Sequence, residues 1–241
     1  MSCMPVLMGM HAIDELLRHA PEKIVRIYFA EGKRDEKILL LCEKRKIPVQ
    51  WVSKRKLEEL AGSPSHQSIV AEIRERQFLS PQELLQRTEK EASSLVLMVD
   101  RLFDPQNFGA ILRSAECFGV SGVVWSKNRG VDLTPTVVKA SCGASELVPL
   151  VRVSNLAYAL EEFQEAGFFA VAALAQPSAE NALTFSFPQK TLLIVGSEGE
   201  GIQPLLQKKV DHSIFIPMQG KIASLNVSNA TAILLALWRS R

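Results

Sequence analysis

Runs of apolar residues constrain the fold of this chain more than any other feature of its sequence. From residue 95 onward they recur at residues 95–100, 120–125, 147–151, 168–173, 191–195 and 213–216. The first begins Leu-Val-Leu-Met-Val without alternation of apolar and polar positions, which suits a strand covered on both faces, as in a parallel sheet. Helical patterns lie between the runs, at residues 108–118, 135–141, 156–166 and 204–209. This alternation of strand and helix predicts a doubly wound α/β sheet.

The first 74 residues form a smaller alternating unit. Strands are expected at residues 24–29, 48–52 and 68–73, with one helix capped by Asp35 and another capped by Ser53. Residues 75–94 are polar and include Ser-Pro at the start of an exposed helix, so we interpret them as an interdomain linker. The predicted domains are therefore residues 1–74 and 95–241.

The composition narrows the classes of function. Hydrophobic residues make up 47% of the 241 residues, and the net charge is +2, so nucleic-acid binding would depend on local clusters such as the basic runs 44–46 and 54–56. Those runs are equally compatible with ordinary helix surfaces. The four cysteines have no CxxC spacing, so we expect no metal site. No apolar run reaches the length of a membrane span, and we expect a cytoplasmic protein without membrane association.

Three segments follow predicted strands and could carry chemistry, because α/β sheets bind ligands beyond the carboxyl ends of their strands. The first runs from Asp100 to Arg113, with Asn107 at the entry of a helix and Arg113 off its apolar face. The simpler alternative is a capping Asn and a solvated Arg. The second is Gly-Ser-Glu-Gly-Glu-Gly at residues 196–201, which is not GxGxxG and whose carboxylates disfavour a phosphate.

The third segment is Ser-Leu-Asn-Val-Ser at residues 224–228, followed by a helix that is apolar almost all round. A terminal helix of this kind must be buried in the fold or in a subunit interface. The alternative interpretation of residues 224–228 is a simple helix cap.

Together and in this order, these segments resemble the three motifs of the SpoU (TrmH-type) RNA 2′-O-ribose methyltransferases of the SPOUT superfamily. Residues 107–113 look like the first motif, residues 194–202 like the second, and Ile-Pro-Met at 216–218 with residues 224–228 like the third. Residues 4–74 are similar to the ribosomal-protein-L30-like substrate-binding domain of the bacterial 23S rRNA guanosine-2′-O-methyltransferases. Ser68 stands where many relatives have Gly after a His-Gln pair.

The resemblance implies an α/β fold with a small L30-like N-terminal domain and a SPOUT domain that ends in a trefoil knot. It also implies S-adenosyl-L-methionine as methyl donor, rRNA as the partner and a homodimer formed through the knot. By motif match, the residues expected to contact the cofactor are Gly196, Ile216 and Leu225. Those expected to form the catalytic surroundings are Asn107, Arg113, Glu198, Ser224 and Asn226.

The chemistry of ribose methylation fits these residue types, because methyl transfer needs in-line geometry more than covalent help. A guanidinium stays protonated, so Arg113 would hold a phosphate and stabilise negative charge on the attacking oxygen. Two alternatives remain open on the sequence: a tRNA ribose methyltransferase, and a non-catalytic RNA-binding relative.

Overall fold

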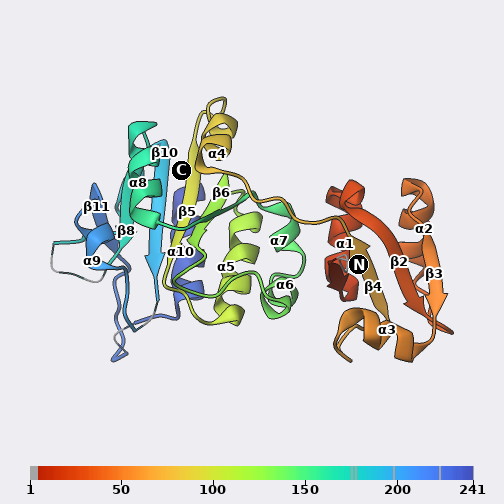
Figure 1. Ribbon diagram of the computed structural model, residues 1–241. Coiled ribbons are helices and arrows are strands. Elements are labelled where there is room, and N and C mark those ends of the chain that lie inside the picture. The colour runs from red at the N-terminus through yellow and green to blue at the C-terminus, as the bar shows by residue number, and fades with distance from the viewer. Residues whose placement is uncertain (1–4, 175, 177, 198, 223, 241) are drawn as a thin grey trace. The chain divides into compact units, whose positions relative to one another are not determined.

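The predicted parallel sheet forms the centre of the larger of two units into which the chain divides (Figure 1). The computed structural model describes residues 5–174, 176, 178–197, 199–222 and 224–240. Unit 1 consists of Met1–Gln77 and Ser141–Leu147, and unit 2 consists of Phe78–Ala140 and Val148–Arg241.

Unit 1 is a four-stranded sheet in the order β1-β4-β2-β3, in which β2 and β3 are parallel and the other pairs antiparallel. Asp35 and Ser53 cap helices as predicted, accepting hydrogen bonds from the backbone N–H groups of Ile38 and Lys56. The short strand β1 was not predicted, because three residues give too little pattern. The elements are β1 (Val6–Met8), α1 (Met10–His19), the 3₁₀ turn η1 (Pro21–Lys23), β2 (Ile24–Ala30), α2 (Glu36–Arg45), β3 (Val49–Val52), α3 (Lys54–Ala61), β4 (Ile69–Ile73) and α7 (Ala144–Leu147).

Helix α7 belongs to unit 1 although it comes late in the chain. Its Glu146 side chain is only 2% exposed and forms an ion pair with Arg76, and the Glu146 carbonyl accepts a hydrogen bond from Lys23. The sequence placed a strand at residues 147–151, but Leu147 ends this helix and the strand begins at Leu150. Pro149 explains the shift, since proline lacks the N–H that a central strand donates.

The structure corrects the expected linker at residues 75–94. Residues 78–94 belong to unit 2 and include helix α4 (Pro81–Thr88), which begins with a capping box between Ser80 and Glu83. Leu84 is fully buried and packs in the same cluster as the first residues of helix α8 (Leu156–Glu165). One apolar stripe is enough to fix a mostly polar helix on the domain surface.

Unit 2 is a seven-stranded sheet in the order β7-β6-β5-β10-β8-β11-β9, and every strand pairing recorded in it is parallel. The apolar runs therefore predicted the correct kind of sheet. Its other elements are β5 (Ser94–Asp100), α5 (Pro105–Cys117), β6 (Gly122–Ser126), α6 (Pro135–Ala140), β7 (Leu150–Val153), β8 (Phe169–Ala173), β9 (Glu180–Asn181), β10 (Lys190–Gly196), α9 (Pro204–Gln207), β11 (His212–Phe215) and α10 (Val227–Arg239).

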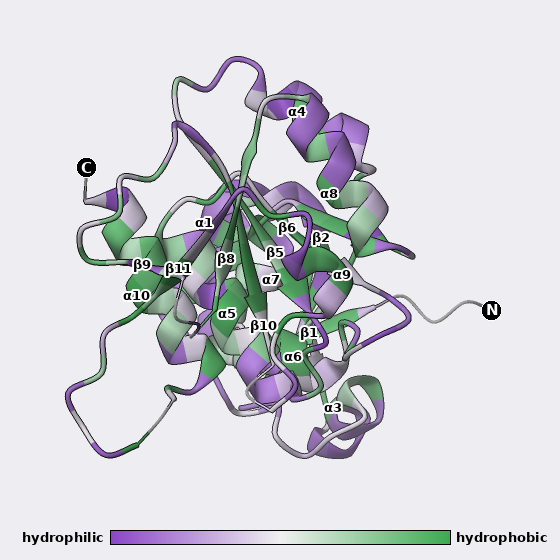
Figure 2. Cartoon of the chain, turned by 90° about the vertical axis from the view of Figure 1, so that its left-hand side faces the viewer, coloured by the Kyte–Doolittle hydropathy of each residue, from purple (hydrophilic) through white to green (hydrophobic). Residues whose placement is uncertain are grey.

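The strands of unit 2 are covered on both faces, as their lack of alternation predicted. Odd-numbered residues of β5, such as Leu97, pack with α5 and α10, whereas Val96 and Met98 pack with α8, α9 and α4. The central strands are green and helix α4 is largely purple in Figure 2, which agrees with strands buried between layers and a helix at the surface. None of the helices within the described residues has the length and apolar character that a membrane span requires.

Helix α10 is covered by its own chain to a greater extent than its sequence suggested. Leu234 and Trp238 are 1% and 6% exposed within the single chain, where they pack in the core shared with α5. The outward-facing apolar residues are Ile233, which is 36% exposed, and Leu237, which is half-buried. The apolar helix by itself therefore does not require a partner subunit.

Candidate functional site

The candidate site lies at the carboxyl ends of the two central strands of unit 2. Strands β5 and β10 pair in parallel register through to their last residues, Asp100 opposite Gly196. The segments that follow these strands therefore leave the same edge of the sheet, which is where parallel α/β sheets place ligands. All three motif segments lead away from this edge or from the neighbouring end of β11.

Asn107 and Asn226 meet at this edge although 119 positions separate them in the sequence. The Asn226 side-chain amide donates a 2.9 Å hydrogen bond to the Asn107 side-chain oxygen. Asn226 is also the N-cap of α10 and accepts from the Ser228 backbone N–H at 2.9 Å. On α5 the capping residue is Asp104, which accepts from the Gln106 N–H, so the interpretation of Asn107 as a cap is wrong.

An apolar cavity of about 330 Å³ lies at the ends of β8 and β11, and its lining includes Leu225, which directly precedes Asn226. Three of the residues predicted from the third motif line this cavity: Ile216, Ser224 and Leu225. An apolar cavity of this size with a few polar groups is typical of a small-molecule site. The described residues that line it are Ala173, Leu174, Ile214, Phe215, Ile216, Met218, Ser224, Leu225, Ala230 and Leu234.

Gly196 lies at the end of β10 in a position where a side chain would collide with the backbone of the following loop. A Cβ atom there would lie 2.4 Å from the Gly201 carbonyl carbon and 2.5 Å from the Ile202 nitrogen. The loop thus folds back onto the strand end, and Ser197 and Gly201 form an isolated antiparallel bridge. The absence of a side chain at Gly196 is therefore required by the chain's own loop, and its predicted contact with the cofactor remains a prediction.

Arg113 lies on α5 and is exposed, off the buried face formed by Phe108, Ile111 and Leu112. It follows Asn107 by six residues, which places it about 9 Å further along the helix axis. Glu198 lies outside the described residues, so its predicted role remains a prediction. The described residues bring together Asn107 with Asn226, and Ile216 with Ser224 and Leu225.

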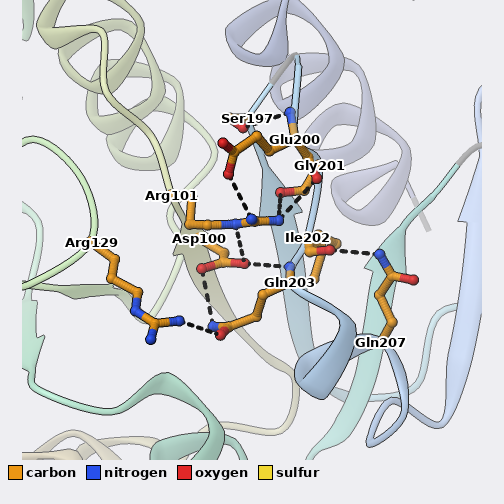
Figure 3. Close-up of polar contacts among 9 residues, drawn as sticks. All are labelled: Asp100, Arg101, Arg129, Ser197, Glu200, Gly201, Ile202, Gln203 and Gln207. Atoms are coloured by element: carbon orange, nitrogen blue, oxygen red, sulfur yellow. Dashed lines mark hydrogen bonds and ion pairs between the residues drawn. The ribbon is translucent and has the colours of Figure 1, made fainter.

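A network of charged and polar side chains around the buried Asp100, at the same strand ends, was not predicted from the sequence (Figure 3). Asp100 is fully buried and accepts from the Gln203 backbone N–H at 2.7 Å and from the Gln203 side-chain amide at 3.2 Å. Arg101 donates to the Glu200 carboxylate at 2.7 Å and to the Glu200 and Gly201 carbonyls at 2.9 and 3.1 Å. Arg129 donates to the Gln203 side-chain oxygen at 3.2 Å.

Burial raises the pKa of the Asp100 carboxyl, while the Gln203 N–H and the nearby Arg101 and Arg129 guanidinium groups act in the opposite direction. Burying a carboxyl costs free energy of desolvation, and the hydrogen bonds from these donors offset that cost. The only indication of this network in the sequence was an Asp at the end of an apolar strand, and that residue alone does not reveal its hydrogen-bond partners.

The fold and the motifs together define the family of this chain. Residues 94–236 match the family model described as "SpoU rRNA Methylase family", and residues 6–79 match the one described as "RNA 2'-O ribose methyltransferase substrate binding". The chain belongs to the SpoU rRNA methylase family. It is an RNA 2′-O-ribose methyltransferase, as the motifs predicted.

Two curated relatives are similar to the chain over nearly their full length. The 23S rRNA (guanosine-2'-O-)-methyltransferase RlmB of Shewanella oneidensis is 35% identical, covering 95% of this chain and 94% of the relative. The protein of the same name from Pseudomonas aeruginosa is 37% identical, covering 94% and 92%.

Solved structures agree with the fold at lower identity. The SpoU methyltransferase AviRb from Streptomyces viridochromogenes has a TM-score of 0.80 at 23% identity, covering 99% of this chain and 90% of that one. The AdoMet-bound rRNA methyltransferase from Sinorhizobium meliloti has a TM-score of 0.79 at 21% identity, covering 99% and 88%. At these identities the likeness concerns the fold. Within the described residues, no group of three or more His, Cys, Asp or Glu side chains is arranged to hold a metal ion.

Proposed function

We propose that this chain methylates the ribose 2′-hydroxyl of a guanosine in 23S rRNA, with S-adenosyl-L-methionine as methyl donor. The observation that carries the proposal is the Asn107–Asn226 hydrogen bond, which joins two family motifs, one of which also lines the apolar cavity through Ser224 and Leu225. The curated relatives named for this reaction support the choice of guanosine and of 23S rRNA.

The cavity fits the methyl donor. Its apolar walls suit an adenosyl group, and the loops at Ile216 and Leu225 supply main-chain groups for the polar edges of that group. Gly196, where a Cβ would collide with the folded-back loop, lets the backbone of the strand end approach the ligand. When bound, S-adenosyl-L-methionine supplies a methyl group on a positively charged sulfur.

We assign the charge stabilisation to Arg113. Its guanidinium remains protonated, so it holds a phosphate next to the target ribose and stabilises negative charge as the 2′-oxygen attacks. Asn226 holds the Asn107 side chain at the start of the helix that carries Arg113. Ser224, on the cavity wall, and Glu198 complete the proposed catalytic surroundings.

Unit 1 is the proposed RNA-binding part, in agreement with its substrate-binding family model. Of its two basic runs, residues 44–46 are the stronger candidate. Residues 54–56 form exposed ion pairs one turn along their own helix, with Glu58 and Glu59, which reduces the positive field of that run.

We further propose a C-terminal trefoil knot, a homodimer and action in the cytoplasm, where 23S rRNA is assembled. The partly exposed Ile233 and Leu237 on α10 support a subunit contact in this region. The proposal of a knot rests on the family resemblance. It agrees with the observed topology, in which β10 lies between β5 and β8 and the chain continues through β11 to α10, which packs against α5.

Mapping of ribose methylation in 23S rRNA and tRNA from a deletion strain tests the function. Loss of one 2′-O-methylguanosine in 23S rRNA, restored by the wild-type gene, is the expected result. Loss of a tRNA methylation would support the tRNA alternative. Unchanged RNA together with no S-adenosyl-L-methionine binding by the purified protein would indicate a non-catalytic relative.

A further inference from the structure

The backbone of Arg101 is strained, and both terminal nitrogens of its guanidinium donate hydrogen bonds to one loop. Its φ angle is +51°, in the left-handed region that side-chain-bearing residues seldom adopt. Its side chain is 18% exposed, and its guanidinium makes three hydrogen bonds, all to Glu200 and Gly201 in the loop after β10. Strain of this kind persists only where the surroundings hold it in place, and it concentrates at functional sites.

The neighbouring Asp100 fastens the other end of the same loop. Both of its carboxylate oxygens accept hydrogen bonds from Gln203, one from the backbone and one from the side chain. The Asp100 carboxylate also lies 3.6 Å from the Arg101 Nε. Two consecutive residues of β5 and its exit thus hold the loop at positions 200, 201 and 203, as Figure 3 shows.

This loop is the one that folds against Gly196. The Gly201 and Ile202 backbone atoms lie within 2.5 Å of where a Gly196 Cβ would be, so the position of Gly201 fixes what Gly196 can present to a ligand. Arg101 binds the Gly201 carbonyl directly. The contacts therefore run from Arg101 through Gly201 to the proposed cofactor-binding strand end.

We propose that Arg101 and Asp100 are positioning residues that hold the loop at Glu200–Gln203 in the conformation in which Gly196 receives S-adenosyl-L-methionine. The proposal rests on the proposed role of Gly196. Neither residue is placed against the reacting atoms; each acts through the loop. A purely structural tether would contribute to the stability of unit 2 without changing affinity for the methyl donor.

Arg101→Gly separates these two roles. Glycine adopts φ +51° without strain, so the variant relieves the backbone while it removes all three hydrogen bonds. Cys142→Gly is the matched control, because Cys142 has the same left-handed φ, +51°, but belongs to unit 1. Arg101→Lys keeps the charge and loses the planar fork, and Glu200→Gln keeps both carbonyl contacts.

Calorimetric binding of S-adenosyl-L-methionine, amide hydrogen exchange at Gly201 and Gln203, and thermal unfolding are measured for each variant. Arg101→Gly is expected to bind the donor at least roughly tenfold more weakly and to exchange faster at both amides, with its melting temperature close to wild type. The donor affinity of Arg101→Lys should fall between those of Arg101→Gly and Glu200→Gln, and Cys142→Gly should bind the donor as wild type does.

Donor affinity within twofold of wild type in Arg101→Gly would overturn the proposal. If that variant fails to fold, Arg101→Lys decides in the same way: unchanged affinity and exchange overturn the proposal, and weaker binding with faster exchange supports it. Failure of the wild-type protein itself to bind the donor would instead contradict the proposed function.

Discussion

Gly196→Ala is the substitution for which the structure gives the clearest magnitude. The added Cβ would lie 2.4 Å from the Gly201 carbonyl carbon, 2.5 Å from its oxygen and 2.5 Å from the Ile202 nitrogen. All three are backbone atoms, and ordinary van der Waals contact begins near 3.4 Å. The loop must therefore move away from the strand end by about 1 Å, because no side chain can rotate to make room.

Such overpacking costs about 1–3 kcal/mol, which lowers the melting temperature of a chain of this size by roughly 2–12 °C. The effect on the rate of methyl transfer should exceed the effect on stability, since a misplacement of reacting groups by about 1 Å reduces the rate by roughly 10²-fold. We therefore expect methyl transfer to fall by about two orders of magnitude and donor affinity by at least about tenfold.

Single-turnover methylation of 23S rRNA and calorimetric donor binding measure these effects. Gly199→Ala is the control within the same loop, because a Cβ there meets nothing within 4 Å. Gly122→Ala is the control for crowding elsewhere in unit 2, where the Cβ would meet only the flexible end of Leu84 at 2.6 Å. Gly122→Ala should lower the melting temperature while leaving donor affinity unchanged.

Equal donor affinity in Gly196→Ala and Gly199→Ala would refute the reasoning, whatever the melting temperatures. Equal losses of affinity in Gly196→Ala and Gly122→Ala would show that general destabilisation, and not the strand end, controls binding.

Three further predictions follow from the site and its surroundings. Arg113→Ala should keep its melting temperature and donor affinity within a few-fold while single-turnover methylation falls by roughly 10²–10⁴, and Arg113→Lys should recover little; wild-type rates in Arg113→Ala would rule out the assigned role. Ile233→Glu places a charge on the exposed side of α10, so sedimentation should show monomers or aggregates if the helix lies in a dimer interface; a wild-type protein that is monomeric at micromolar concentration would exclude the dimer. Neutralising residues 44–46 should weaken RNA binding and flatten its salt dependence more than neutralising residues 54–56, without changing donor affinity; equal salt slopes in filter-binding titrations would contradict this ranking.

The strands and helices of unit 2 could be predicted because their signals are local. Six of its strands coincide with apolar runs, with ends shifted by at most three residues. Strand β9 has only two residues, Glu180 and Asn181, so it carries no hydrophobic pattern and exists only through pairing with β11. Helix α4 was recognised, but its attachment to unit 2 depends on the burial of Leu84, which no local pattern reveals.

In the candidate site, too, residue identities could be predicted from local motifs, whereas the contacts between them depend on tertiary packing. Asn107 and Asn226 were identified from two short motifs, yet the hydrogen bond between them depends on how α10 packs against α5. Ile216 and Leu225 were named as cofactor contacts from a motif, and the structure adds that both line one cavity with Ala173 and Leu174, which no motif indicated.

The Asp100–Arg101 network shows why such residues escape a reading of the sequence. Arg101 adopts a left-handed conformation although it is neither glycine nor asparagine, the residue types that usually indicate one. Its hydrogen-bond partners lie about a hundred positions away in the sequence. In the sequence, Asp100 is simply the polar residue that ends an apolar strand. The parallel register of β5 with β10 brings the loop after β10 close enough for the Gln203 N–H to donate to its carboxylate. A buried carboxylate without those donors would be costly, so its burial already implied partners, but not which ones. The register of the central strands therefore determines the position of the loop, and through Gly201 it determines the shape of the strand end at Gly196.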